Sequence, residues 1–459
     1  MVEQMMQGNA SEIAATQTIP AGYKQTDVGV IPEDWEVVCL GDIGQSLIGL
    51  TYSPKDVSDD GVLVLRSSNV QNGRLAYEDS VFVKMELPDR VIVKDGDILI
   101  CVRNGSRQLI GKCALIDKSA QGFAFGAFMT VYRTKASGFV FYQFQSDVIQ
   151  SQINETMGAT INQITNRDLS GFKIMIPNSI LEQTTIANVL SDTDALIGAL
   201  EQLIAKKQAI KTASMQQLLT GRTRLPQFAL RPDGTPKGYK TSELGHIPED
   251  WHEVSLSSVT KNIDAGVSVN SIDQLDAYGH GKHVLKTSCV NGGVFNCLEA
   301  KSIIPSDTGR AKCFPCEGNI IVSRMNTPAL VGEIGYIEKS LPGYFLPDRL
   351  WQVSFREDAE LNTKWLMYVL AHPINSKKIK ESATGTSNSM KNISKNAFLA
   401  LNFYKPNIEE QTAIATILSD MDSELNALKQ KLAKARDLKQ GMMQQLLTGR
   451  IRLPVEQVE

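Results

Sequence analysis

Two long stretches of the chain repeat one pattern of hydrophobic and polar positions. Residues 182–226 and 410–454 align without a gap at a constant offset of 228, and apolar side chains recur in both at steps of three and four. This spacing predicts one long helix in each stretch, with an apolar seam of the coiled-coil type. The expected helix-pairing residues are Leu190, Ile197, Leu200, Ile204, Leu418, Met421, Leu425, Leu428, Leu432 and Ala435. We expect the two helices to pair with each other as an antiparallel coiled coil.

The ends of both helices are marked by the sequence. A capping-box pattern precedes each helix, and a glycine suited to a left-handed C-cap, Gly221 or Gly449, follows each one. These signals predict helical segments over residues 179–221 and 407–449.

A second, shorter repeat precedes the variable part of each half. Residues 22–43 and 238–259 share the motif IPEDW, at Ile31–Trp35 and at Ile247–Trp251. We interpret the motif as a turn that leads into a short strand and is anchored in the core by its tryptophan.

The regions between the repeats resemble each other only in pattern. Short apolar runs bounded by Gly, Asn and Asp predict strands and hairpin turns, and a helical stretch is expected near residues 139–157 and 362–382. The sequence therefore predicts a mixed α/β fold (α+β, β-rich), with two globular domains, two long helices and a pseudo-twofold internal repeat. The expected segments are a leader (1–21), a first domain (22–178), a helix (179–221), a connector (222–237), a second domain (238–406), a helix (407–449) and a tail (450–459).

Bulk composition narrows the class of protein. A net charge of −3 over 459 residues argues against general coating of nucleic acid, although it leaves room for local basic clefts. Seven cysteines, an odd number, are typical of reduced thiols in a cytoplasm. The N-terminal residues lack the features of a signal peptide, and no apolar run is long enough for a membrane helix, so we expect a cytoplasmic protein.

Catalytic and metal-binding motifs are missing from the sequence. It contains no Walker A loop, no GxGxxG, no HExxH and no tetrapeptide of the amino-methyltransferase type. Among Cys289, Cys297, Cys313 and Cys316, only the last two have the pair spacing of a structural zinc site, so we interpret the group as ordinary thiols and leave zinc as the alternative. We expect no catalysis, metal or cofactor in this chain.

Polar loops in both halves carry the side chains that read DNA bases. Arginine suits guanine, whereas asparagine and glutamine suit adenine. Three such clusters recur at matching places in the two halves, and this recurrence favours a DNA-binding role over the alternative that they merely form turns. In the first half the candidates are Arg66, Asn69, Gln71, Asn72 and Arg74; Arg103, Asn104, Ser106, Arg107 and Gln108; and Asn162, Gln163, Asn166 and Arg167. In the second half they are Lys286, Ser288 and Asn291; Arg324 and Asn326; and Asn388, Ser389, Lys391, Asn392 and Lys395.

The duplicated helix ending in QQLLTGR, the repeated IPEDW motif and the two divergent domains resemble the DNA-specificity subunit of type I restriction–modification enzymes, over residues 22–454. The resemblance implies that each domain reads one half of an asymmetric, split double-stranded DNA site. It implies that the helices space the two domains and hold two modification subunits, which methylate adenine N6 using S-adenosylmethionine. Restriction (motor–nuclease) subunits that use ATP and Mg²⁺ would then join the complex for defence against phage.

Two alternatives stay open at this point. One is the equivalent subunit of a related system that cuts on both sides of its site, and the other is a coiled-coil scaffold that does not bind DNA. For a helix of 38 residues, the rise of about 1.5 Å per residue gives about 57 Å. At roughly 3.4 Å per base pair, such a helix limits the half-site separation to about 17 base pairs.

Overall fold

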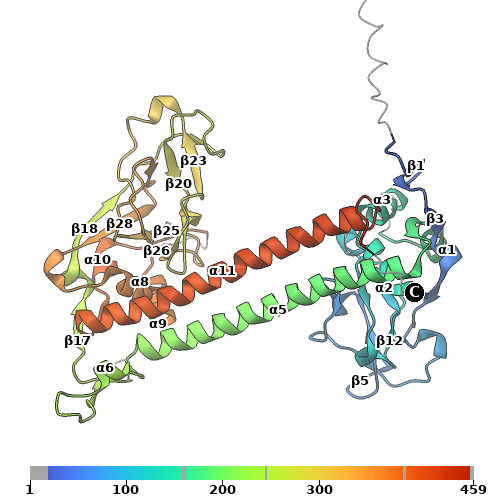
Figure 1. Ribbon diagram of the computed structural model, residues 1–459. Coiled ribbons are helices and arrows are strands. Elements are labelled where there is room, and N and C mark those ends of the chain that lie inside the picture. The colour runs from blue at the N-terminus through green and yellow to red at the C-terminus, as the bar shows by residue number, and fades with distance from the viewer. Residues whose placement is uncertain (1–18, 158–161, 243–244, 386–388, 455–459) are drawn as a thin grey trace, which may run out of the picture. The chain divides into compact units, whose positions relative to one another are not determined.

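The computed structural model describes residues 19–157, 162–242, 245–385 and 389–454 (Figure 1). The chain divides into unit 1 (Met1–Glu201 with Gln430–Glu459) and unit 2 (Gln202–Lys429). Each unit contains one globular domain and a part of both long helices, α5 (Ile180–Leu218) and α11 (Ile408–Leu446). The internal repeat of the sequence is thus also a repeat of structure.

Unit 1 has two four-stranded sheets around one core. One sheet is antiparallel and has the strand order β11-β10-β13-β4, and the other has the order β12-β6-β9-β5, in which β12 and β6 are parallel. The strands are β4 (Gly44–Ile48), β5 (Val57–Ser58), β6 (Val62–Leu65), β9 (Phe82–Val83), β10 (Ile98–Cys101), β11 (Cys113–Leu115), β12 (Ala124–Phe125) and β13 (Met129–Thr134). All four residues of β10 are buried, as expected for a strand at the centre of a domain.

Unit 2 repeats this arrangement in the same order along the chain. Its sheets have the orders β18-β28-β24-β26 and β19-β23-β20-β27, and here β20 and β27 are the parallel pair. The strands are β18 (Thr260–Ala265), β19 (Ser271–Ile272), β20 (His283–Leu285), β23 (Ala300–Ile303), β24 (Ile320–Ser323), β26 (Ile334–Tyr336), β27 (Tyr344–Phe345) and β28 (Leu350–Phe355). The mixed α/β fold predicted from the sequence is confirmed in both units.

Short helices accompany the sheets of both units. Unit 1 has α1 (Leu40–Ile43), α2 (Ser137–Phe144), α3 (Asp147–Thr156) and α4 (Asn166–Gly171), and unit 2 has α6 (Pro226–Ala229), α7 (Leu256–Val259), α8 (Thr363–Ala371), α9 (Pro373–Glu381) and α10 (Lys395–Leu399). The helical stretch expected in each half is in fact two helices. In unit 2 the break falls at Pro373, which occupies the first position of α9 because proline cannot continue a preceding helix.

The IPEDW motif lies where a hairpin meets the strand that closes each domain. The hairpins are β1 (Tyr23–Thr26) with β2 (Gly29–Pro32), and β15 (Tyr239–Ser242) with β16 (Gly245–Pro248). The closing pairs are β3 (Trp35–Cys39) with β14 (Lys173–Pro177), and β17 (His252–Ser255) with β30 (Asn402–Lys405). Trp35 and Trp251 are at most 1% exposed, which confirms that the motif's tryptophan anchors the core.

Within each unit the two long helices run antiparallel. In unit 1, Asp194 pairs with Lys439 and Glu201 pairs with Arg436, at 2.8 and 2.6 Å. In unit 2, Lys207 pairs with Glu424 at 2.7 Å, and Lys211 pairs with Asp422. The partner's number falls as the α5 number rises, so the helices have opposite directions. Of the expected helix-pairing residues, Leu190, Ile197, Leu418, Leu425 and Ala435 are buried and Leu200, Ile204, Met421, Leu428 and Leu432 are half-buried.

A tyrosine from each domain joins both long helices. Tyr368 donates its hydroxyl hydrogen to Asp422 of α11 at 2.7 Å, and Lys211 of α5, which pairs with the same aspartate, lies 5.6 Å from the tyrosine ring. In unit 1, Tyr142 binds Asp194 of α5 at 3.0 Å, and Lys439 of α11 lies over its ring. Burial raises the pKa of both tyrosines, and the neighbouring aspartate raises it further.

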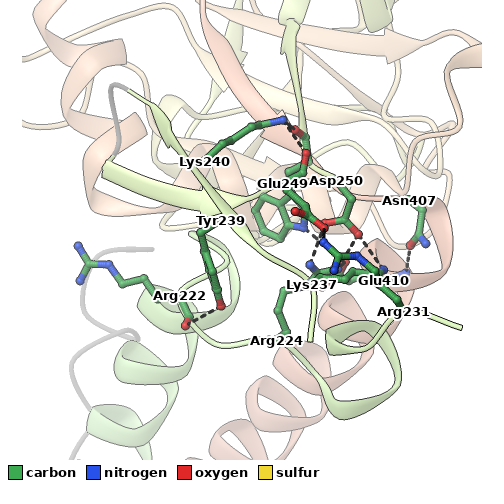
Figure 2. Close-up of polar contacts among 11 residues, drawn as sticks. Arg222, Arg224, Arg231, Lys237, Tyr239, Lys240, Glu249, Asp250, Asn407 and Glu410 are labelled. Atoms are coloured by element: carbon green, nitrogen blue, oxygen red, sulfur yellow. Dashed lines mark hydrogen bonds and ion pairs between the residues drawn. The ribbon is translucent and has the colours of Figure 1, made fainter. Parts of the chain in front are cut away.

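A buried arginine fixes the IPEDW motif to the helix ends in unit 2 (Figure 2). Arg224 donates to both oxygens of Glu410 at 2.6 and 2.7 Å, and to both oxygens of Asp250 at 2.8 and 3.2 Å. Its side chain is 5% exposed, and that of Glu410 is 1% exposed. Lys237 neutralises Asp250 further, at 2.8 Å. We call this group the unit 2 junction.

Unit 1 contains the matching junction, where the IPEDW motif, the start of α5 and the segment after α11 meet. Arg452 pairs with Asp34 and with Glu182, both at 2.8 Å, and lies over the Trp35 ring. The sequence predicts a tail over residues 450–459, but Arg452 is bound into unit 1 by its ion pairs with Asp34 and Glu182. The capping boxes are only half formed: Asn407 accepts the backbone N–H of Glu410 at 2.9 Å, whereas the carboxylates of Glu182 and Glu410 bind the arginines.

Glycine is required where each long helix ends at its junction. Gly221 and Gly449 have φ values of +68° and +67°, the left-handed region predicted for the C-cap. A Cβ atom would lie 2.4 Å from Pro248 at the first position and 2.5 Å from Pro32 at the second. Both the conformation and the close contact with the IPEDW proline therefore exclude a side chain.

Candidate nucleic-acid interface

Three polar loops of the first domain meet at one place. Asn104 donates its side-chain amide to the hydroxyl of Ser67 at 3.0 Å, and the Asn162 amide donates to the Gly105 carbonyl at the same distance. Arg103 forms a β-bridge with Gln163. The three loops that carry these clusters are thus held in contact by hydrogen bonds.

The second domain joins its clusters in a related way. A short ladder pairs β25 (Met325–Asn326) with β29 (Lys391–Asn392), and Arg324 donates to the side chain of Asn392 at 3.3 Å. Arg324 also donates to the carbonyl of Asp348 at 2.7 Å. Asp348 and Lys286 both line a cleft of about 440 Å³, which brings the first cluster beside the second.

The candidate DNA-contacting residues differ in exposure. The exposed ones are Gln71, Asn72, Arg74, Arg103, Ser106, Arg107, Gln108, Arg167, Ser288, Asn291, Ser389 and Lys395. The half-buried ones are Arg66, Asn104, Asn162, Gln163, Asn166, Lys286, Arg324, Asn326, Lys391 and Asn392. Asn69 is buried, and Asn388 lies outside the described residues.

One of these predictions is wrong. Asn69 is 0% exposed, and its side chain accepts the backbone N–H of Arg66 and donates to the carbonyls of Ala76 and Asp79. Because these bonds use the amide on both sides, Asn69 stabilises its loop and has no group left for a base.

Two other candidates bind backbone carbonyls of distant segments. Arg74 donates to the backbone carbonyl of Asp194 in α5, where its guanidinium lies over Gly198. Lys395 donates to the carbonyl of Ile263 at 2.7 Å. Local sequence could not show these contacts, because each joins segments more than a hundred residues apart.

Several polar side chains of the loops also have partners inside their own domain. Arg66 pairs with Asp79 and Lys286 with Asp273, at 2.8 and 2.6 Å. The hydrogen bond from Lys286 holds the pKa of the Asp273 carboxyl below its usual range, so the pair of Lys286 and Asp273 stays charged at neutral pH. Arg107 donates to the carbonyl of Asn154 at 3.0 Å. These contacts hold the loop side chains against their own domain.

Two exposed residues beside the candidate loops, Phe128 and Arg349, are not among the sequence-predicted ones. Phe128 is 57% exposed and lies under the guanidinium of Arg103, at 5.2 Å from ring centroid to Cζ. Arg349 is exposed and lines the same cleft as Lys286. Phe128 and Arg349 each lie in a tight turn before the next strand. Phe128 follows Arg103 at the same spacing at which Arg349 follows Arg324, and this shared spacing is the sequence signal that could have identified them.

Two observations on the described residues concern metal binding and reactive thiols. Among these residues no three His, Cys, Asp or Glu side chains are grouped so that they could hold a metal ion. Burial raises the pKa of Cys101 and Cys313 to about 11 and that of Cys113 to about 12, so these thiols stay protonated at neutral pH. No described helix is both long and apolar enough to cross a membrane.

Comparisons with known proteins identify the family of this chain. The family model described as the type I restriction modification DNA specificity domain matches the chain twice, over residues 32–212 and 248–435. The chain therefore belongs to the family of type I restriction–modification DNA specificity subunits.

Individual relatives match along almost their whole length. The MjaVIII specificity subunit of Methanocaldococcus jannaschii is 26% identical over 92% of this chain and 94% of its own length. The EcoKI specificity subunit of Escherichia coli K12 is 23% identical over 92% and 90%. The crystal structure of the type I restriction–modification S subunit from M. genitalium shares the fold, with a TM-score of 0.58 at 15% identity over 90% of this chain and 96% of that one.

Proposed function

We propose that this specificity subunit reads an asymmetric, two-part DNA site, one part with each globular domain. The observation that carries this proposal is the pair of domains with one fold and different loop side chains. Arg103, Ser106 and Gln108 are exposed in the first domain, whereas Ser288, Asn291 and Arg349 are exposed in the second. Since bases are distinguished by the donors and acceptors presented to them, unlike loops on one scaffold select unlike half-sites.

The long helices are the spacer in this proposal. They pair along their length as an antiparallel coiled coil, so that the two recognition domains are held at a fixed separation. The ion pairs between α5 and α11 in each unit and the buried seam residues support this role. Near-identical helix ends and junctions in the two halves give two equivalent surfaces, which suit two copies of one modification subunit.

The chemistry belongs to the partners in this proposal. The modification subunits bind S-adenosylmethionine and methylate adenine N6, and the restriction subunits use ATP and Mg²⁺. This chain then contributes recognition and assembly, which agrees with the absence of catalytic motifs in its sequence.

Selection from random DNA tests the proposal. The chain is co-purified with its cognate modification subunit, and duplexes retained by the complex are sequenced; the modification subunit alone is the control. We expect enrichment of one motif with two specified segments on either side of an unspecified spacer of constant length. Enrichment of a single continuous motif, or of the same DNA by the control, would contradict it.

A further inference from the structure

The two domains present different side chains at one equivalent position. In the first domain, Met129 donates its backbone N–H to the Gly126 carbonyl at 2.8 Å and so closes a turn. In the second, Leu350 donates to the Pro347 carbonyl at 3.2 Å and closes the matching turn. Both turns connect the parallel strand, β12 or β27, to the central strand β13 or β28.

The third residue of each turn is held by the same backbone contact. The N–H of Arg103 donates to the Phe128 carbonyl, and the N–H of Arg324 donates to the Arg349 carbonyl, both at 3.1 Å. The arginine and the turn residue keep the same spacing, since 324 − 103 and 349 − 128 both equal 221. Phe128 and Arg349 are therefore structural equivalents.

Neither side chain contributes to a core. Phe128 is 57% exposed, and its visible partner is the guanidinium of Arg103. The contact with Arg103 holds the ring in place while more than half of its surface stays open to solvent. Arg349 is exposed, and its guanidinium has no hydrogen bond or ion pair to any of the residues that the structure describes. Both side chains are thus available to a ligand.

The surroundings of the two residues fit DNA. Phe128 stands beside the contact of the 103–108 and 162–167 loops through Arg103 and its bridge to Gln163. Arg349 lines the 440 Å³ cleft together with Lys286 and Lys301, which share Asp273 as their counter-ion. The cleft carries three cationic side chains against Asp273 and Asp348, so its net charge attracts phosphate.

Building on the proposed function, we infer that this turn position determines specificity in each domain, with Phe128 contacting a thymine methyl group and Arg349 reading a guanine. A phenylalanine ring has no donor or acceptor, so in the major groove it discriminates by apolar contact with the C5-methyl of thymine. An arginine donates two hydrogen bonds to guanine O6 and N7, a pattern that no other base presents. The same backbone turn thus supplies opposite kinds of readout to the two half-sites.

The test uses Phe128→Ala and Arg349→Ala in the full chain, expressed with the cognate modification subunit. Sequencing of N6-methyladenine in cellular DNA gives the motif for each variant. We expect Phe128→Ala to lose selection at one thymine of one half-site, and Arg349→Ala to lose selection at one guanine of the other. Each variant is the control for the other, because the half-site that it leaves unchanged shows that the complex is folded and active.

Binding to synthetic duplexes tests the chemistry of each contact. Replacing the relevant thymine by deoxyuridine removes only the methyl group, and we expect it to weaken binding of the wild-type complex about 5-fold and that of Phe128→Ala less than about 2-fold. Replacing the relevant guanine is expected to weaken wild-type binding at least about 10-fold, and to affect Arg349→Ala far less.

The outcomes separate this inference from the proposed function. If the wild-type chain produces a split motif and both variants reproduce it with equal stringency, this inference is wrong and the proposed function stands. Loss of selection in the same half-site by both variants would also overturn it. If the wild-type chain produces no motif that depends on its presence, both fail together.

Discussion

Removing the buried arginine of the unit 2 junction should destabilise that unit strongly. Arg224→Met keeps the aliphatic stem but leaves the Glu410 carboxylate, 1% exposed, without its counter-charge. Its remaining side-chain contact is the Trp251 ring N–H at 3.4 Å. Loss of one partner from a buried ion pair typically costs about 3–5 kcal/mol. We expect a loss in this range, because Asp250 keeps Lys237 and most of the cost falls on Glu410.

Two further variants test whether an unpaired glutamate carboxylate causes the loss of stability. In Arg224→Met with Glu410→Leu no charge is left unpaired, so the double variant should be more stable than Arg224→Met alone. The matched variant Arg452→Met acts in unit 1, where it leaves the Glu182 carboxylate, 3% exposed, without its counter-charge. There we expect a loss in the same range, about 3–5 kcal/mol.

Hydrogen exchange measured by mass spectrometry reports each unit separately. Peptides covering residues 245–255 and 408–415 report opening of the unit 2 junction, and peptides covering residues 31–39 and 180–187 report the unit 1 junction. A loss below about 1 kcal/mol in unit 2 for Arg224→Met, or a double variant no more stable than the single one, would refute the reasoning that an unpaired Glu410 carboxylate sets the cost.

Three further predictions concern pH, the glycines and the spacer. Burial raises the pKa of Asp250, but its bonds to Arg224 and Lys237 outweigh burial, so the pKa lies below its usual value and the stability that it contributes is full above about pH 4 and is lost as pH falls further. Asp250→Asn should therefore lose less stability than wild type between about pH 4 and pH 2, as measured by urea unfolding. Equal losses of unfolding free energy in the two proteins over this pH range would count against this prediction. Gly441→Ala should stabilise the chain by about 0.5–1 kcal/mol in urea unfolding, because nothing lies within 4 Å of the new Cβ. Gly198→Ala should stabilise it less, because the new Cβ would force Arg74 to move. Equal gains in stability would contradict the contact between Arg74 and Gly198. Removing or adding whole helical turns in residues 196–211 should change the spacer of the methylated motif but neither half-site, and an unchanged spacer would disprove that α5 sets it.

Most of the fold could be predicted from the two repeats in the sequence. The two helices, the buried tryptophans and the left-handed glycines Gly221 and Gly449 were predictable, because each depends on a local pattern or on a conformation that few residues adopt. The paired helical stretches were predicted as one helix each, although Pro373 marks the break in the second.

The contacts between distant segments could not be predicted from local pattern. Arg452 pairs with Asp34 across most of the chain, and Arg74 binds a carbonyl of α5; neither has a signal near it in sequence. Asn69 has the side chain and loop setting of a base-reading residue, yet its three hydrogen bonds are internal. Residue type alone does not show whether a polar group is already satisfied, and that decides its role.

Single-molecule sequencing of DNA from cells that carry the cognate modification subunit, with and without this chain, tests the central claim most directly. The account predicts N6-methyladenine at one asymmetric split motif when the chain is present, and loss of that motif when it is absent. Methylation that is identical in the two strains would contradict the claim that this chain selects the DNA site.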